Sequence, residues 1–200
     1  EIGYDKEGLD KKIRDFVDNY NSLIDEIGVL TKYGESELED DGALAGDSLL
    51  RGIQSGLASI VGDSNSASAL GGLFQLGIEF DDDGKLEIGT TDYGLGSGED
   101  RLADALEDSF DEIASLFTDD DEGVAVRLYE FANQYTSYSG LISLRETAAK
   151  DDRDDLYDER ETLELRMLSY EEILRDKYLN LDQTVAQLNQ TSSALLASLG

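Results

Sequence analysis

Carboxylates beside a glycine are the first side chains in this sequence that could do chemistry. In the segment EFDDDGKLEIGT, Asp81, Asp83 and Gly84 occupy the third, fifth and sixth positions of a calcium-binding loop. The ends do not fit, because Glu79 stands where such a loop needs Asp and Thr90 where it needs a bidentate Glu. Strand-like patterns flank the segment in place of helices. We therefore predict a hairpin turn with Gly84 at positive φ, and no metal site.

Other catalytic and cofactor patterns are equally weak. Paired carboxylates can hydrolyse glycosides, but 46 acidic residues make any pair uninformative, and Trp is absent. The chain has no Cys and no His, which excludes Ser/His/Asp and Cys/His nucleophiles, disulfides and zinc sites built from these residues. The stretch GLGSGED at 94–100 lacks dinucleotide-loop spacing and a Lys for phosphate. We predict no catalytic residue, no cofactor and no enzymatic activity.

The charge balance limits the partners. With 16 basic against 46 acidic residues the net charge is −30, which argues against nucleic acid and anionic membranes, since both attract Lys and Arg. No run approaches the ~20 apolar residues of a membrane span. A hydrophobic content of 40% is enough for a core, and the acidic runs are interpreted as solvated surface suited to a saline medium. Because the chain starts at Glu1 without Met, we expect a fragment of a longer protein.

The front of the chain, up to Gly140, holds nineteen of the twenty glycines and shows short amphipathic patterns. A first helix is expected to end at Gly34 and a second to start at Ser48. Their inward positions are Leu9, Ile13, Phe16, Val17, Tyr20, Ile24 and Ile27, then Leu50, Ile53, Leu57 and Ile60. A β-hairpin follows, with alternating Leu76, Ile78 and Phe80, then Leu86 and Ile88. One helix with Leu102, Leu106, Phe110, Ile113 and Phe117 on one side, and a short helix with Leu128, Phe131 and Tyr135, complete this part.

The rear of the chain predicts a long helix. No Gly lies between Leu141 and Leu199 and the chain has no Pro, so these residues form one helix or two end-to-end helices, up to about 90 Å long. Apolar residues repeat there as in a coiled coil, at Leu163, Met167, Tyr170, Leu174, Tyr178, Leu181, Val185, Leu188, Leu195 and Leu199. The predicted fold class is mainly α with a small β-hairpin (α+β).

The last eighteen residues, 183–200, carry no charge at all. An amphipathic helix without a charged shell, in a chain this acidic, is expected to pack against other chains. The residues predicted to make oligomer or filament contacts are Leu174, Leu181, Val185, Leu188, Leu195 and Leu199. The sequence thus predicts an assembly component.

The end of the chain, LDQTVAQLNQTSSALLASL at 181–199, resembles the C-terminal signature of bacterial flagellar filament-capping proteins, the FliD or hook-associated protein 2 family. Further segments agree in order across the chain. They are FVDNYNSLIDEI at 16–27, GALAGDSLLRGIQSGL at 42–57, LGIEFDDDGKLEI at 76–88, GVAVRLYEFANQY at 123–135 and GLISLRE at 140–146.

The resemblance implies a structural role at the distal tip of an extracellular flagellum. It implies a ring-like homo-oligomer that holds flagellin for folding and insertion, with an export chaperone as a further partner. It also implies a division into a helical leg domain with the hairpin, residues 1–148, and a terminal coiled-coil helix, residues 149–200. The family's N-terminal helix and most of its β-rich plate domains would precede Glu1.

Two alternatives stay open at this point. The chain could belong to another flagellar axial component, either flagellin or a junction protein, because these share the style of coiled-coil tail. It could also be a surface adhesin or a carboxylate-rich calcium-binding module. Polymerisation behaviour would test the first alternative, and calorimetry against calcium the second.

Overall fold

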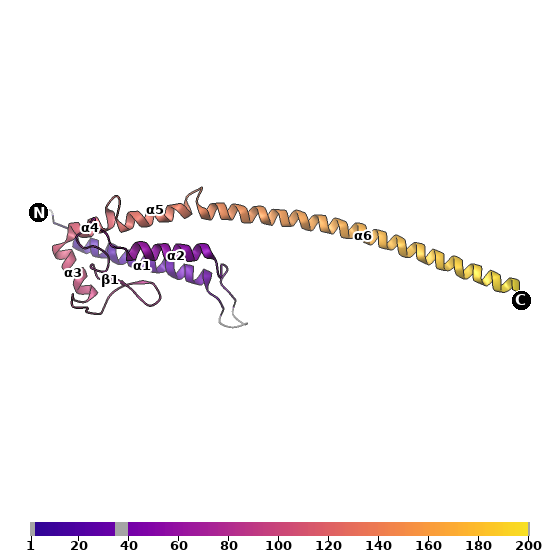
Figure 1. Cartoon of the computed structure of the whole chain (residues 1–200), viewed down its shortest axis with the longest axis horizontal. Coiled ribbons are helices and arrows are strands. Elements are labelled where there is room, and N and C mark those ends of the chain that lie inside the picture. Colours follow the sequence, from indigo (N-terminus) through magenta and orange to yellow (C-terminus); the bar gives the residue numbers. More distant parts are fainter. Residues whose placement is uncertain (1–2, 35–39, 200) are drawn as a thin grey trace. The chain divides into compact units, whose positions relative to one another are not determined.

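The computed structural model describes residues 3–34 and 40–199, except the side chains of 198 and 199. The residues divide into two compact units, Glu1–Ser137 and Tyr138–Gly200. The first unit is helical with a two-stranded antiparallel sheet, and the second holds one long helix (Figure 1). The predicted fold class, mainly α with a small β-hairpin, is confirmed.

Helix α1 (Lys6–Thr31) begins where the Asp5 carboxylate accepts a hydrogen bond from the Gly8 N–H at 2.9 Å. It does not reach Gly34, and that prediction was wrong. The returning chain ends the helix, because the N–H groups of Gly42 and Leu44 donate to the carbonyls of Lys32 and Leu30 at 2.9 and 2.8 Å. These bonds satisfy carbonyls that the helix end would otherwise leave free.

The core of the first unit is built on one face of α1. Its buried positions follow at steps of four and three, which keeps them on a single stripe: Ile13, Val17, Tyr20, Ile24 and Ile27. Helix α2 (Ser48–Gly62) starts where predicted, capped by Asp47, whose carboxylate accepts from the N–H groups of Leu49 and Leu50. On α2, Val61 is buried, whereas Ile60 is only half-buried, contrary to prediction.

The hairpin pairs β1 (Ile78–Phe80) with β2 (Leu86–Ile88), with Ile78 opposite Ile88 and Phe80 opposite Leu86. The Asp81 carboxylate closes the turn by accepting from the N–H groups of Asp83 and Lys85 at 2.9 and 2.8 Å. Gly84 has φ of 78°, so the predicted hairpin with a left-handed glycine is confirmed.

Three glycines join the hairpin to the next helix. The Gly89 N–H donates to the Gly77 carbonyl at 2.9 Å, and the Gly98 N–H donates to the Gly89 carbonyl at 2.6 Å. Gly77 has φ of 95°, and a Cβ there would lie 2.2 Å from the Gly98 oxygen. The junction therefore requires glycine at Gly77.

The helix predicted around Leu102 to Phe117 is two helices, α3 (Gly98–Asp108) and α4 (Phe110–Thr118). Ser109 breaks it, with φ of −135° and ψ of 33°, and the turn lets Ile113 reach a fully buried position (0% exposed). A capping box between Ser97 and Asp100 starts α3. Helix α5 (Val124–Thr136) carries the predicted short apolar stripe and ends before Gly140.

The second unit is α6 (Leu141–Leu199), one uninterrupted helix of 59 residues. At 1.5 Å per residue it is about 88 Å long. Figure 1 shows it as a single, gently curved ribbon from orange to yellow. The prediction of one or two helices is resolved in favour of one.

Candidate functional site

The acidic residues of the described structure do not gather into a metal site. Within residues 3–34 and 40–199, no group of three or more Asp or Glu side chains is placed to hold an ion. In the glycine-rich loop, the Asp92 carboxylate accepts from the N–H groups of Gly94 and Gly96 at 2.6 and 3.0 Å. These carboxylates fold the backbone locally. Across the same described ranges, no helix has the length and apolarity to span a membrane.

A buried ion pair links three parts of the first unit. Arg101 on α3 is only 6% exposed, and its guanidinium donates to the Glu79 carboxylate on β1 and to the Phe74 carbonyl. It also lies 4.4 Å from the centre of the Phe74 ring. Because a buried cation is stable only when paired, this arrangement fixes the hairpin against α3. The pair therefore has a structural role in the first unit.

Exposed ion pairs join helices across the same unit. Arg14 on α1 donates two bonds to the Glu99 carboxylate on α3, at 3.0 and 2.7 Å. The hydrogen bonds from Arg14 hold the pKa of Glu99 below its usual range. The hydroxyl and N–H of Ser66 likewise lower the pKa of Glu122. The lowered pKa values favour the charged form of both carboxylates, which hold α3 against α1 and the Ser66 segment against Glu122.

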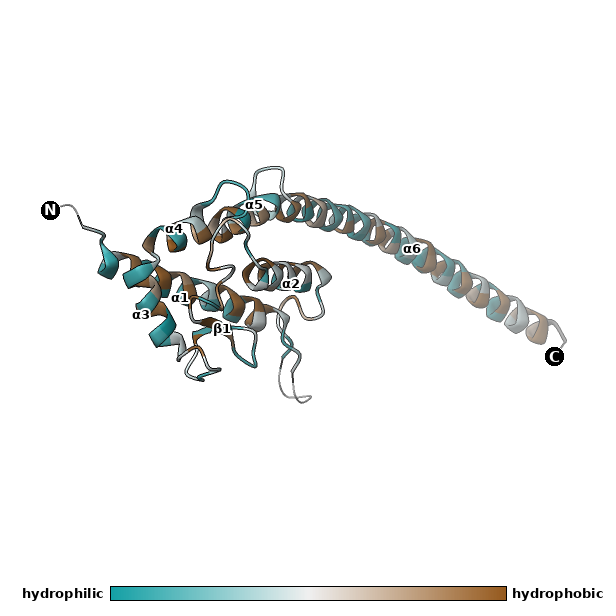
Figure 2. Ribbon diagram, turned by 60° about the vertical axis from the view of Figure 1, so that its left-hand side comes forward, coloured by the Kyte–Doolittle hydropathy of each residue, from teal (hydrophilic) through white to brown (hydrophobic). Residues whose placement is uncertain are grey.

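The most extended feature without a covering element in the described structure is an apolar stripe on α6. We define the stripe by apolar residues that follow one another on one face at steps of three, four or seven positions: Leu156, Leu163, Met167, Tyr170, Leu174, Tyr178, Leu181, Val185, Leu188 and Leu195. Figure 2 shows brown, apolar residues recurring along the helix between teal ones. Leu188 is 64% exposed and Leu163 58%. Isolated large apolar residues are ordinary on a surface, but a row of this length marks an interaction surface.

Five of the six predicted contact residues belong to this stripe. Leu181, Val185, Leu188 and Leu195 are all exposed, and Leu174 is half-buried. Leu174 has Tyr170 and Tyr178 one turn before and after it on the same face. The side chain of Leu199 lies outside the described residues. That these residues contact other chains stays a prediction.

Three hydroxyl side chains of the charge-free end donate hydrogen bonds within the helix. Thr184, Thr191 and Ser193 each donate to the carbonyl four residues earlier, at 2.8, 2.8 and 2.9 Å. A neighbouring chain could therefore cover these side chains without leaving a buried donor unpaired. At these three positions, coverage by another chain would carry no cost for an unpaired hydroxyl.

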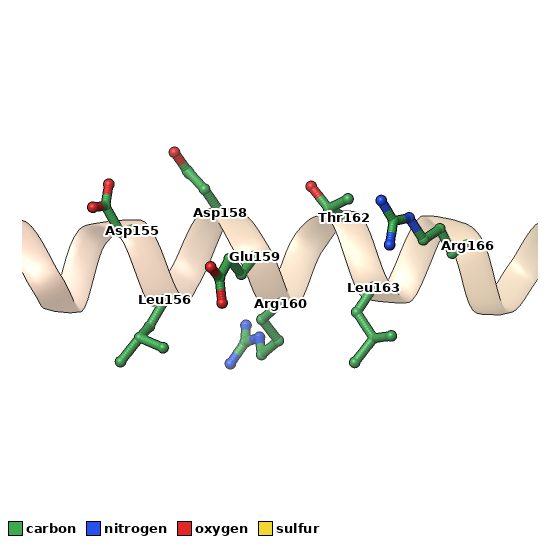
Figure 3. A pocket seen from close by; sticks show the side chains of 8 residues that line it. All are labelled: Asp155, Leu156, Asp158, Glu159, Arg160, Thr162, Leu163 and Arg166. Carbon is green, nitrogen blue, oxygen red and sulfur yellow. The ribbon is translucent and has the colours of Figure 1, made fainter.

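Leu156, the first residue of the stripe, was not among the residues predicted from the sequence. Leu156 lies seven residues before Leu163, so the same spacing could have found it. Figure 3 shows this part of α6, where Leu156, Arg160 and Leu163 point to one side and Asp155, Asp158, Thr162 and Arg166 to the other. The stripe therefore continues into the charged part of the helix.

A helical unit with a small hairpin, together with a long helix that carries an exposed apolar stripe, is an architecture typical of coiled-coil proteins. The sequence profile described as "Flagellar hook-associated protein 2 C-terminus" matches residues 1–190. The chain belongs to this family.

Individual relatives agree. The flagellar hook-associated protein 2 of Aeromonas caviae is 31% identical over 200 residues, covering 98% of this chain and 41% of the relative. The A-type flagellar hook-associated protein 2 of Pseudomonas aeruginosa is 29% identical, covering 99% and 40%. A crystal structure of the flagellar cap protein FliD (domains D1-D2-D3) from Escherichia coli is similar with a TM-score of 0.56 and 34% identity, covering 68% of this chain and 35% of that one. The chain thus spans about two-fifths of the curated relatives that it matches.

Proposed function

We propose that this chain is the C-terminal part of a protein that caps the distal tip of the bacterial flagellar filament and promotes the folding and insertion of flagellin. The observation that carries the proposal is the family match over residues 1–190, together with the likeness to a solved flagellar cap protein. The alternatives, another axial component or an adhesin or calcium-binding module, have no comparable support.

The proposal gives the two parts of the chain different tasks. Residues 1–148 form the leg domain and 149–200 the terminal helix, which makes the contacts of a ring-like homo-oligomer and of flagellin. An export chaperone is a further proposed partner, and the place of action is outside the cell, at the tip of the flagellum. What supports the tail contacts is the exposure of the apolar stripe and the lack of charge beyond Asp182.

Complementation tests the function. The full-length protein is expressed in a motile bacterium that lacks its filament cap, beside a version truncated after Asp182. We expect filaments with the full-length protein and none with the truncation. If neither protein restores filaments, the capping function is contradicted. If both restore filaments, the role of the tail is contradicted.

A matched pair of triple variants separates the stripe from mere helix content. The variant Leu181→Ser, Val185→Ser and Leu188→Ser removes apolar contacts. Its control replaces residues on the opposite face, Gln183→Ser, Gln187→Ser and Gln190→Ser. Both sets add three serines of equal helix propensity. Filaments should be lost with the stripe variant alone.

A further inference from the structure

We propose that the outer edge of β1, together with the apolar cleft beside it, binds an extended apolar segment of an unfolded flagellin chain as an added strand. The inference rests on the proposed function and adds to it the place where the incoming chain is held. It is carried by the free backbone groups of this edge, by the cleft that lies against it and by the pairing of the charges that line the cleft.

The hydrogen bonds of the hairpin show which backbone groups of β1 face outward. The Asp81 N–H donates to the Lys85 carbonyl across the hairpin at 2.9 Å. Because the bonding direction alternates along an antiparallel strand, Ile78 and Phe80 turn their N–H and C=O groups away from β2. The Ile78 N–H donates to the Leu73 carbonyl at 3.0 Å. Among the described residues, the Ile78 carbonyl and both backbone groups of Phe80 have no hydrogen-bond partner.

The edge of β2 is closed at Leu86 by a side chain. The Asn21 amide on α1 donates to the Leu86 carbonyl at 2.8 Å, and its oxygen accepts from the Leu86 N–H at 2.7 Å. Asn21 thus makes both bonds that a neighbouring strand would make there. Proteins usually cover or block such edges, because free backbone groups pair with other chains. In the described structure nothing caps Phe80 in this way, so the edge of β1 is open to an added strand.

A cleft of about 430 Å³ lies against the open edge. Its apolar lining comes from the end of α2, the segment before β1 and the two strands: Val61, Leu73, Phe74, Ile78, Phe80 and Leu86. Gly71 lines it as well, and a Cβ there would meet no atom within 4 Å. In strand addition, backbone bonds supply affinity and pockets for alternate side chains supply specificity. The cleft therefore offers room for an apolar side chain of the added strand.

The charges that line the cleft favour an uncharged occupant. Asp63 lies 2.6 Å from the Arg127 guanidinium, and Glu79 pairs with the buried Arg101. Neither carboxylate requires a cation from the ligand. A chain that has not yet folded presents apolar side chains together with unpaired backbone groups, which are the groups that this edge and cleft match. A folded helix uses its backbone N–H groups internally, so the segment would be released as flagellin folds.

Site-specific photocrosslinking tests the site in the full-length protein. The photoreactive residue p-benzoylphenylalanine replaces Phe80 in one variant and, as a matched control outside the cleft, Tyr129 on α5, which is 71% exposed. Each variant is irradiated with flagellin monomers freshly diluted from urea. We expect an adduct with an apolar segment of flagellin, mapped by mass spectrometry, at position 80 and none above background at position 129. No flagellin adduct, equal adducts at both positions, or an adduct only with a second copy or with the protein's own chain overturns the inference.

A proline variant tests the backbone bond separately from the ring. Phe80→Pro removes the outward N–H without breaking a bond to β2, and Phe80→Ala lacks the ring but keeps the N–H. We expect unfolded flagellin to bind Phe80→Pro about fivefold more weakly than Phe80→Ala, the effect of one hydrogen bond. Equal near-ultraviolet circular dichroism of the two variants verifies the fold, and equal binding then contradicts the added strand. If Phe80→Pro does not fold, the crosslinking result decides.

Complementation with the same full-length variants separates this inference from the proposed function. A protein that restores filaments but gives no flagellin adduct at position 80 overturns the inference and leaves the proposed function intact. An adduct at position 80 from a protein that restores no filaments supports the cleft as a binding site and contradicts the capping function.

Discussion

Replacing Arg101 with Met should destabilise the first unit more than any surface change. The substitution leaves the Glu79 carboxylate unpaired, although its side chain is only 14% exposed. Removal of one partner from a buried ion pair costs about 3–5 kcal/mol. The lost hydrogen bond to the Phe74 carbonyl adds about 1 kcal/mol, while Met retains much of the packing on the Phe74 ring. We expect Arg101→Met to lower the free energy of unfolding by about 4–6 kcal/mol.

The double variant Arg101→Met with Glu79→Met is the matched comparison. Exchange of a whole buried pair for apolar residues is often neutral or stabilising. We therefore expect the free energy of unfolding of the double variant to lie within about 1 kcal/mol of the wild-type value, once the lost hydrogen bond to the Phe74 carbonyl is accounted for. The coupling free energy between the two sites should then be large, on the order of 3 kcal/mol or more.

Urea unfolding followed by near-ultraviolet circular dichroism measures these values. Far-ultraviolet signals would be dominated by the 59 residues of α6, which need not unfold with the first unit. The near-ultraviolet signal reports ordered aromatic residues such as Tyr20, which is 5% exposed. A loss below about 1 kcal/mol for Arg101→Met, or a double variant as unstable as the sum of the singles, would refute the argument.

Three further predictions concern the same unit. Gly77→Ala should cost more than 1 kcal/mol, because φ of 95° is strained for Ala and its Cβ would collide with the Gly98 carbonyl; thermal unfolding measures it. Ile113→Ala, at a position with 0% exposure, should cost about 3 kcal/mol in urea unfolding through the cavity it leaves. The pKa of Glu99 is lowered by Arg14, so this pair stabilises the fold above the ordinary carboxyl pKa, and the stabilisation is lost as the pH falls through the lower folded-state pKa. The stability difference between wild type and Glu99→Gln should therefore shrink in acid, and a difference that grows in acid would contradict the assignment.

Local features of this fold could be read from the sequence, and long-range ones could not. Asp47 before an apolar stripe predicts the start of α2, and DDDG between alternating residues predicts the hairpin. The end of α1 depends on hydrogen bonds from a segment that returns a dozen residues later, and the break at Ser109 depends on packing in the core. Arg101 and Glu79 are 22 positions apart in the sequence, so their pairing cannot be predicted from the periodicity of a helix or a strand.

The candidate site was more accessible to sequence reasoning because it lies on one helix. Within α6 every position follows from 3.6 residues per turn, so the exposed stripe from Leu163 onward could be predicted from spacing alone. The periodicity of a single helix carries no information about what packs against the stripe.

The acidic residues of α6 stop well before its end, and this difference bears on how many neighbouring helices each part of α6 could accept: Asp151, Asp154, Asp158, Glu161, Glu172 and Asp176 lie on the face opposite the stripe, and residues 183–200 carry no charge. Up to Asp176, carboxylates on the face opposite the stripe keep one side hydrated, so the helix can be covered from the other side alone. From Gln183 onward no charge opposes coverage, and the hydroxyls of Thr184, Thr191 and Ser193 are satisfied by the helix itself. We therefore expect neighbouring helices to cover more of the surface of α6 beyond Gln183 than before Asp176, so that a bundle of such helices would be open at the charged end and close-packed at the tail.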